Sequence, residues 1–172
     1  MRFLKNLYYS FLGLIRGTSA HYQRVKEFHK KGNQPHSDKP RELSAKEREL
    51  RAALILEEAL ETIEGLGIHV AIVGLRDATH YDVDTESTFE LTPMDYYDPI
   101  EVIDGCADLI YVTTGTMVQM GIKDKGPQEE VDYSNLTKFR DGYSVRYDGK
   151  IIKSPLYEPA NIKKELEQQG LK

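Results

Sequence analysis

The sequence predicts an all-α, four-helix-bundle-like core with a small β-hairpin near the C-terminus. Two observations carry this prediction. Several long segments combine helical apolar spacing with capping signals at their ends, and two of them carry acidic residues three and four positions apart. A third observation, the Asp148-Gly149 pair between short β-prone segments, predicts the hairpin. A chain of 172 residues is long enough to form one domain with a core of its own.

The N-terminal part of the chain predicts three helices. The first covers about residues 3–15, and the second covers about residues 19–31. A polar connector rich in Gly and Pro follows, at residues 32–40. The pattern Ser44-Ala-Lys-Glu47 is a capping box, so the third helix is expected to start there and to run to about Glu64, where glycines end it.

The rest of the chain is less regular. Residues 69–74 fit either a helical turn or a strand, and the polar stretch 76–90 is expected to be a loop or an insertion. Asp98-Pro99 suits the start of a long helix that ends near Met120. We further expect a short helix at residues 129–136 and the hairpin at residues 143–152. A last helix is expected to start at Pro159.

Net charge and cysteine content limit the kinds of binding partner and the cellular setting that we expect. The net charge of −5 argues against a protein that binds nucleic-acid backbones. Cys106 is the single cysteine, so no internal disulfide can form, and a cytosolic setting is expected. Its apolar neighbours predict a small core residue rather than a nucleophile.

The first twenty residues have a basic start and a short apolar stretch, Leu7 to Ile15. This stretch is too short to cross a bilayer, and no convincing cleavage site follows it. We expect an amphipathic helix that packs on the domain or on a second subunit rather than one that contacts a membrane. Association with a membrane surface is the alternative interpretation.

Two acidic clusters are the most informative feature of the chain. Residues three and four apart share a helix face, so each cluster should converge on one side of its helix. The surroundings are apolar, which predicts buried helices whose acids require a hard divalent cation such as Mg²⁺ or Mn²⁺. The histidines are scattered, which disfavours zinc. The clusters are Glu57, Glu58 and Glu61, and then Glu101, Asp104 and Asp108.

This pattern resembles the all-α nucleoside triphosphate pyrophosphohydrolases, which include the MazG family, the phosphoribosyl-ATP pyrophosphohydrolases and the dimeric dUTPases. Their mark is Glu-Glu-x-x-Glu on one helix and Glu-x-x-Asp on a later one. The resemblance implies Mg²⁺ ligation by Glu58, Glu61, Glu101 and Asp104. It implies that Glu57 is a further ligand or positions the attacking water, so that Glu57, Glu58 and Glu61 form the catalytic set. Asp108 would support the ligands from one turn away.

A second group of motifs strengthens the resemblance, which covers about residues 20–160. Ser134-Asn135, Lys138, Asp148-Gly-Lys150, Lys153-Ser-Pro and Tyr157-x-Pro159 are similar to the C-terminal signature of a MazG-like subgroup. Asn135, Lys138, Lys150 and Lys153 are therefore candidate substrate-binding residues, although lysines on a solvated edge strand are the simpler explanation for a hairpin. The spacer between Glu61 and Glu101 is longer than the family pattern, so residues 66–97 are interpreted as an insertion.

The resemblance implies a Mg²⁺-dependent enzyme that hydrolyses a nucleoside triphosphate to the monophosphate and pyrophosphate, as a house-cleaning enzyme or a dUTPase-like one. Hydrolysis of phosphoribosyl-ATP is the first alternative, and a helical partner-binding module with a structural metal is the second. We expect a single domain, with an amphipathic helix at 1–17, a catalytic core at 19–136 and a basic tail at 137–172. We also expect a homodimer or a dimer of dimers.

Overall fold

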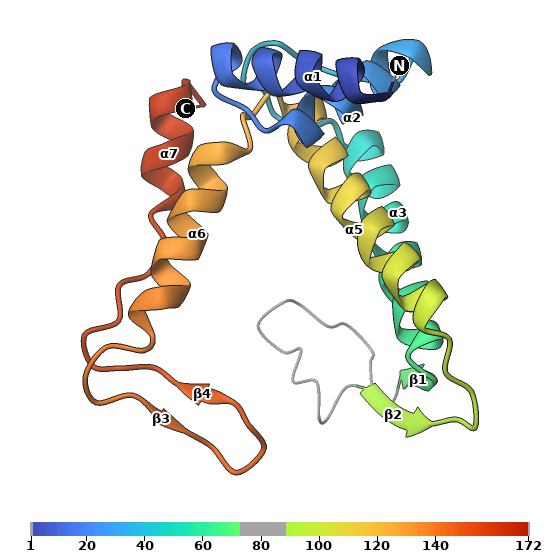
Figure 1. Ribbon diagram of the computed structural model, residues 1–172, viewed down its shortest axis with the longest axis vertical. Coiled ribbons are helices and arrows are strands. Elements are labelled where there is room, and N and C mark those ends of the chain that lie inside the picture. Colours follow the sequence, from blue (N-terminus) through green and yellow to red (C-terminus); the bar gives the residue numbers. More distant parts are fainter. Residues whose placement is uncertain (1, 73–88, 172) are drawn as a thin grey trace. The chain divides into compact units, whose positions relative to one another are not determined.

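The computed structural model describes residues 2–72 and 89–171 (Figure 1). The described chain is mainly helical, with two small antiparallel sheets of two strands each, which confirms the predicted fold class. It divides into two compact units. The first unit comprises Met1–Leu43 and Thr114–Lys172, and the second comprises Ser44–Thr113. The single-domain interpretation stays a prediction, because two compact units can still fold as one cooperative domain.

The first unit begins with α1 (Arg2–Arg16) and α2 (Ala20–Lys31), which pack on each other. The Ser19 hydroxyl accepts a hydrogen bond from the Tyr22 amide at 2.9 Å and so caps α2, as the sequence predicts. The core of this unit contains Val25 of α2 and Val118, both without exposed surface. Tyr22 and Ile122 are almost fully buried as well.

The connector after α2 is held along the C-terminal end of α5 (Pro99–Met120) by backbone hydrogen bonds. Ser37 donates to the Val118 carbonyl at 3.1 Å, and Arg41 donates to that of Met120 at 2.9 Å. Gly121 ends α5 with a φ of +68°, and a Cβ there would stand 2.2 Å from the Lys39 carbonyl oxygen. Only glycine fits this position, because it has the required φ and no side chain.

The second unit contains α3 (Ala45–Gly65), the strands β1 (Ile68–Ile72) and β2 (Phe89–Pro93), and residues 99–113 of α5. The capping box of Ser44 and Glu47 is present, which confirms the predicted start of α3. The sequence allows either a helical turn or a strand at residues 69–74, and residues 69–72 belong to the strand β1. The antiparallel partner of β1 is β2, with Val70 opposite Leu91. Residues 73–88, with His80 and most of the predicted insertion, lie outside the described residues.

The C-terminal part of the first unit contains α6 (Lys125–Thr137), the strands β3 (Ser144–Val145) and β4 (Ile151–Ile152), and α7 (Ile162–Gln169). The hairpin and its turn at Asp148-Gly149 are confirmed, and Gly149 has a φ of +85°. The helix predicted at 129–136 starts four residues earlier, with Pro127 in its first turn.

Two smaller expectations are wrong. The last helix starts at Ile162 rather than at Pro159, because the Asn161 side chain accepts a hydrogen bond from the Lys164 amide and caps it there. Cys106 is exposed and is not a core residue. Across residues 2–72 and 89–171, no helix combines the length and apolar character needed to cross a bilayer.

Candidate active site

The site begins with an unusually close approach of two helices. Gly105 of α5 faces Thr62 of α3, and a Cβ on Gly105 would stand 2.5 Å from the Thr62 hydroxyl oxygen. Near the end of α3, a Cβ on Gly65 would stand 3.1 Å from the Cβ of Glu101. Thr62 is buried, and its hydroxyl donates to the Glu58 carbonyl oxygen at 2.7 Å within α3. Glycines that let two backbones approach bring the two acidic helix faces next to each other.

A cavity of about 330 Å³ lies between these helices within the second unit. Its lining is almost entirely acidic, with one tyrosine and the close-approach glycine. The lining residues are Glu61, Glu64, Tyr96, Glu101, Asp104, Gly105 and Asp108. Four of the six acids singled out in the sequence, one from α3 and three from α5, therefore line one cavity.

The remaining two acids, Glu58 and Glu57, differ in position. Glu58 is half-buried, and its pKa is raised by burial first and then by the negative charges of Asp108, Glu61, Glu57 and Asp104. Because two of these charges belong to α5, Glu58 belongs to the same acidic cluster. Glu57 is exposed and does not line the cavity.

The expectation of buried acidic helices is wrong for the single chain. Glu61, Glu101, Asp104 and Asp108 are exposed, and so are apolar neighbours such as Ile103. Two helices alone cannot enclose the cluster, because each covers only one side of the other. The acids nevertheless repel one another, and across the described residues no Lys or Arg side chain forms an ion pair with them. Among the described residues, therefore, no ion pair compensates the surplus negative charge at the cavity.

Within the described residues, no three Asp, Glu, His or Cys side chains are arranged to hold a metal ion in the conformation observed. The donor set itself is suitable for Mg²⁺ or Mn²⁺, because it consists of carboxylate oxygens alone. The carboxylates of Glu61, Asp104 and Asp108 are on exposed side chains, which can change rotamer. The residues present therefore fit a hard divalent cation by their chemistry.

Three further residues belong to the site, although none of them is among the predicted site residues. Tyr96 donates a hydrogen bond from its hydroxyl to Glu101 at 2.5 Å, and this bond is the main reason that the pKa of Tyr96 is raised to about 12. Glu64 lines the cavity one turn after Glu61. Gly105 had a visible signal, since a glycine inside a long helix is unfavourable unless a neighbour needs the space.

The helix start that presents Glu101 is also well defined. The Asp98 carboxylate accepts hydrogen bonds from the amides of Ile100 at 2.8 Å and Glu101 at 3.4 Å. The Asp98 amide in turn donates to the Gly65 carbonyl at 3.0 Å, which ties the start of α5 to the end of α3. The predicted Asp98-Pro99 start of this helix is confirmed.

The candidate substrate-binding residues lie in the first unit, and three of the four gather near one tyrosine. Lys138 donates to the Asn135 side-chain oxygen at 2.6 Å, and the Lys153 ammonium lies 4.4 Å from the ring centre of Tyr157. The pKa of Tyr157 is lowered by a hydrogen bond from Ser134 and by the charges of Lys153 and Lys138. The exposed Lys150 lies in the hairpin turn, apart from these contacts.

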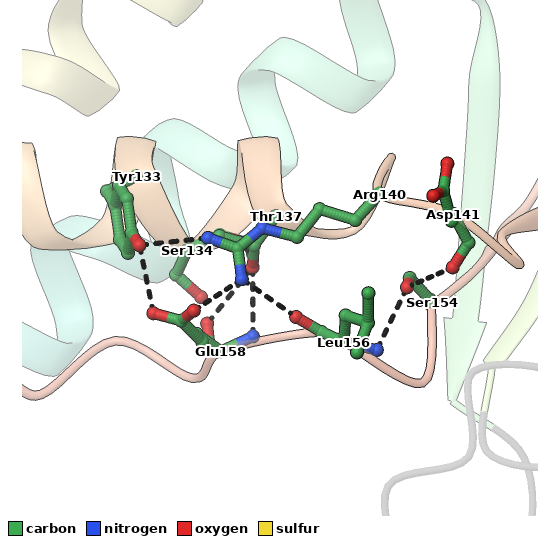
Figure 2. A network of polar contacts seen from close by, with 8 residues as sticks. All are labelled: Tyr133, Ser134, Thr137, Arg140, Asp141, Ser154, Leu156 and Glu158. Carbon is green, nitrogen blue, oxygen red and sulfur yellow. Dashed lines mark hydrogen bonds and ion pairs between the residues drawn. The ribbon is translucent and has the colours of Figure 1, made fainter.

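A polar network holds the tail against α6 (Figure 2). The Arg140 guanidinium forms an ion pair with Glu158 and donates to the Leu156 carbonyl at 3.0 Å. It also donates to the Tyr133 hydroxyl at 2.9 Å, and Tyr133 donates to Glu158 at 2.9 Å. The Glu158 amide donates to the buried Thr137 hydroxyl at 3.0 Å. These bonds fix the segment that carries Lys153 and Tyr157.

A mainly helical fold with an acid-lined cavity between two helices agrees with the class of all-α nucleotide pyrophosphohydrolases, which are hydrolases acting on phosphoric anhydrides. A model of the phosphoribosyl-ATP pyrophosphohydrolase family matches residues 25–135, well over half of the chain, and the chain belongs to this family. A search of curated proteins gives no match to the chain. The match confirms the recognition made from the two acidic motifs, and it spans both of them.

Proposed function

We propose that this enzyme hydrolyses a nucleoside triphosphate, in a Mg²⁺-dependent reaction, to the nucleoside monophosphate and pyrophosphate. The observation that supports the proposal is the cavity between α3 and α5, whose lining supplies five carboxylates next to Glu58. An acidic cavity repels a triphosphate unless cations accompany it, so the charge of the lining itself points to a metal-bound substrate.

In the proposed site, Glu58, Glu61, Glu101 and Asp104 hold Mg²⁺, with Mn²⁺ as a substitute. When bound, the ion neutralises phosphate charge and lowers the pKa of a coordinated water. Glu57 lies next to Glu58 at the edge of the cluster, where it is suited to orient the attacking water or to add a ligand. Asp108, one turn beyond Asp104, supports the ligands by charge rather than by direct binding.

The chain's own residues would do the positioning. Tyr96 holds the Glu101 carboxylate through its hydroxyl and limits its rotation, and Asp98 fixes the backbone at Glu101. Catalysis of phosphoryl transfer depends mostly on positioning and on electrostatics. Asn135 and Lys138 are proposed to bind the substrate, with Lys153 and Lys150 as further phosphate contacts, since ammonium groups act as point charges toward phosphate.

Phosphoribosyl-ATP is the second candidate substrate, and the family match favours it directly. A module that binds a partner and keeps a metal for structure alone is disfavoured, because the matched family consists of hydrolases. The two candidate reactions share the same acidic site and differ in what occupies the base side of the substrate.

The oligomeric state is part of the proposal. Leu56 and Leu60 on α3, and Ile103 and Ile110 on α5, are exposed apolar residues on the helices that carry the acids. Covering such residues with a second copy would bury them and would enclose the acidic cluster. We therefore propose a homodimer, or a dimer of dimers. We also propose a cytosolic location, because the chain has a single cysteine and does not use internal disulfides.

The test is pyrophosphate release from a panel of deoxynucleoside and ribonucleoside triphosphates, together with phosphoribosyl-ATP, in Mg²⁺ and in Mn²⁺. We expect release from at least one triphosphate, and none by Glu61→Gln. Glu49→Gln is the matched control, because it makes the same change on an exposed position of the same helix. If pyrophosphate is released from phosphoribosyl-ATP alone, that compound is the substrate instead of a nucleoside triphosphate. If no compound in the panel releases pyrophosphate, the proposal is overturned.

A further inference from the structure

α1 packs against its own protein with its polar side. Its Tyr9 hydroxyl donates to Glu27 of α2, and Arg24 of α2 donates to Asn6 at 3.1 Å and lies over the Tyr9 ring at 5.5 Å. Arg16 donates to Gln23 at 3.2 Å. The hydrogen bonds of α1 to α2 therefore use residues 6, 9 and 16, which lie on one side of the helix.

The opposite side of α1 is apolar and exposed. At about 100° per residue, its large apolar side chains cover an arc of about 140° that contains no polar residue. Their exposed fractions run from 57% to 76%. These residues are Phe3, Leu4, Leu7, Tyr8, Phe11, Leu14 and Ile15. A continuous apolar surface of this kind requires a partner, because single exposed apolar residues are common but contiguous ones are not.

Charge selects the partner. Residues 1–31 contain seven Lys and Arg residues but a single acid, Glu27, although the whole chain has a net charge of −5. Lys5 lies about 60° beyond the end of the apolar arc at Tyr8, and α1 itself contains no acidic residue. Pairing α1 with α1 of a second copy would bring two basic helices together without any complementary charge on them.

We propose that α1 is a docking surface for an anionic lipid bilayer, on which it lies parallel to the membrane plane. An exposed apolar arc on a basic helix without acidic residues is the pattern of an interfacial helix, and its 15 residues are too few to span a bilayer. The inference does not depend on the proposed nucleotide chemistry. The expected packing of this helix on the domain is present on its polar side, which contacts α2, and the proposal assigns a membrane surface to its apolar side.

The test is co-sedimentation of the full-length protein with vesicles of phosphatidylcholine, alone or mixed with phosphatidylserine. Binding is expected to the mixed vesicles, and it is expected to weaken as salt is added. Leu7→Asp should lower the bound fraction at least about tenfold, since it removes a large apolar side chain from the arc. Leu156→Asp is the matched control, because Leu156 is exposed to nearly the same extent, 57% against 60% for Leu7.

A second pair of variants tests the charge. Lys5→Gln should weaken binding to the mixed vesicles by about fivefold, whereas Lys163→Gln, on the exposed α7, should leave it unchanged. Equal binding to both kinds of vesicle, or none to either, would overturn the proposal. Light scattering without lipid gives a further test. If Leu7→Asp lowers the molecular mass of the wild-type protein, the apolar side of α1 binds a second copy of the chain, and the proposal is overturned.

Discussion

Gly105 and Thr62 are in direct contact across the two acidic helices, with no room for a methyl group between them. A Cβ on Gly105 would meet the Thr62 hydroxyl oxygen at 2.5 Å and the Thr62 Cα at 3.1 Å. The contact lies beside Asp104 on one helix and beside Glu61 on the other, so it sets the separation of the two acidic faces.

The first prediction concerns this contact. Gly105→Ala forces the helices apart, and we expect it to destabilise the fold by about 1–3 kcal/mol, as overpacking does, and to lower activity as well. Gly32→Ala is the control, because the Cβ that it adds would stand 3.3 Å from its nearest neighbour, the Phe28 carbonyl oxygen. Denaturant unfolding measures the stability of both variants. Equal stability of Gly105→Ala and the wild type would show that the helices are not in close contact.

The second prediction concerns the acids. Asp104→Asn and Glu101→Gln keep the size of the side chain and remove its charge, so the fold should persist. Loss of a residue that only supports a metal ligand lowers activity by about 10–100-fold. Loss of a ligand itself should lower turnover further. Circular dichroism checks the fold, and pyrophosphate release checks the turnover. Full activity in either variant would remove that residue from the site.

The third prediction concerns metal binding. Mg²⁺ that binds only the folded chain should stabilise it by about 2.7 kcal/mol at a concentration one hundred times Kd. The midpoint of thermal unfolding should therefore rise with Mg²⁺ and return on chelation. Glu61→Gln should lose this dependence, and Glu49→Gln should keep it. A midpoint that does not respond to Mg²⁺ or Mn²⁺ in the wild type would contradict the proposed site.

The fourth prediction separates the lysines. Lys138 is bonded to Asn135, whereas Lys150 is exposed in the hairpin turn. Lys138→Met should raise KM or lower kcat/KM by about tenfold or more, the scale of one charged hydrogen bond. Lys150→Met makes the same change and should have a smaller effect. The reverse order in steady-state kinetics would move the phosphate contact to the hairpin.

The fifth prediction concerns pH. The ammonium of the buried Lys26 lies 2.5 Å from Asp38, and this hydrogen bond and charge lower the pKa of the carboxyl below its ordinary value. The pKa of Asp38 is lower in the folded chain than in the unfolded chain. The ion pair therefore contributes its full stabilisation of the fold above the unfolded pKa, and this stabilisation is lost as the pH falls through the folded pKa.

Asp38→Asn should therefore lower the stability by about 0.5–1 kcal/mol near neutral pH, the size of a solvent-screened ion pair. In acid the difference from the wild type should shrink toward zero. Thermal unfolding at several pH values measures it. A difference that stays constant, or one that grows in acid, would mean that the ion pair does not stabilise the fold.

Much of the fold was predictable because local signals decide it. The capping box at Ser44, the Asp98-Pro99 start and the Asp148-Gly149 turn each depend on a few adjacent residues, and all three are present. The start of the last helix was misplaced, because Pro159 and Asn161 both suit a helix start and the Asn161 side-chain bond decides between them.

Burial was the less predictable property. An apolar helix circumference indicated burial, yet Ile103 is 69% exposed and Cys106 is exposed in the single chain. Sequence periodicity shows which residues should be covered, but it does not show what covers them. The hydrogen bond from Tyr96 to Glu101 was not predictable either, because it depends on the path of the loop before α5. Glu64 could have been predicted, because it lies three residues after Glu61 on the same helix face.

The sequence by itself determined the helices and the spacing of acids along them, since both follow from the 3.6-residue period and from capping chemistry. Only the tertiary structure decided that Gly105 and Thr62 touch, because these residues lie far apart in the chain. It also decided that Tyr96 donates a hydrogen bond to Glu101, because the loop before α5 has no periodic pattern that fixes where its side chains point. It alone decided that α1 packs with its polar side on α2, because an amphipathic pattern does not specify which face meets the protein.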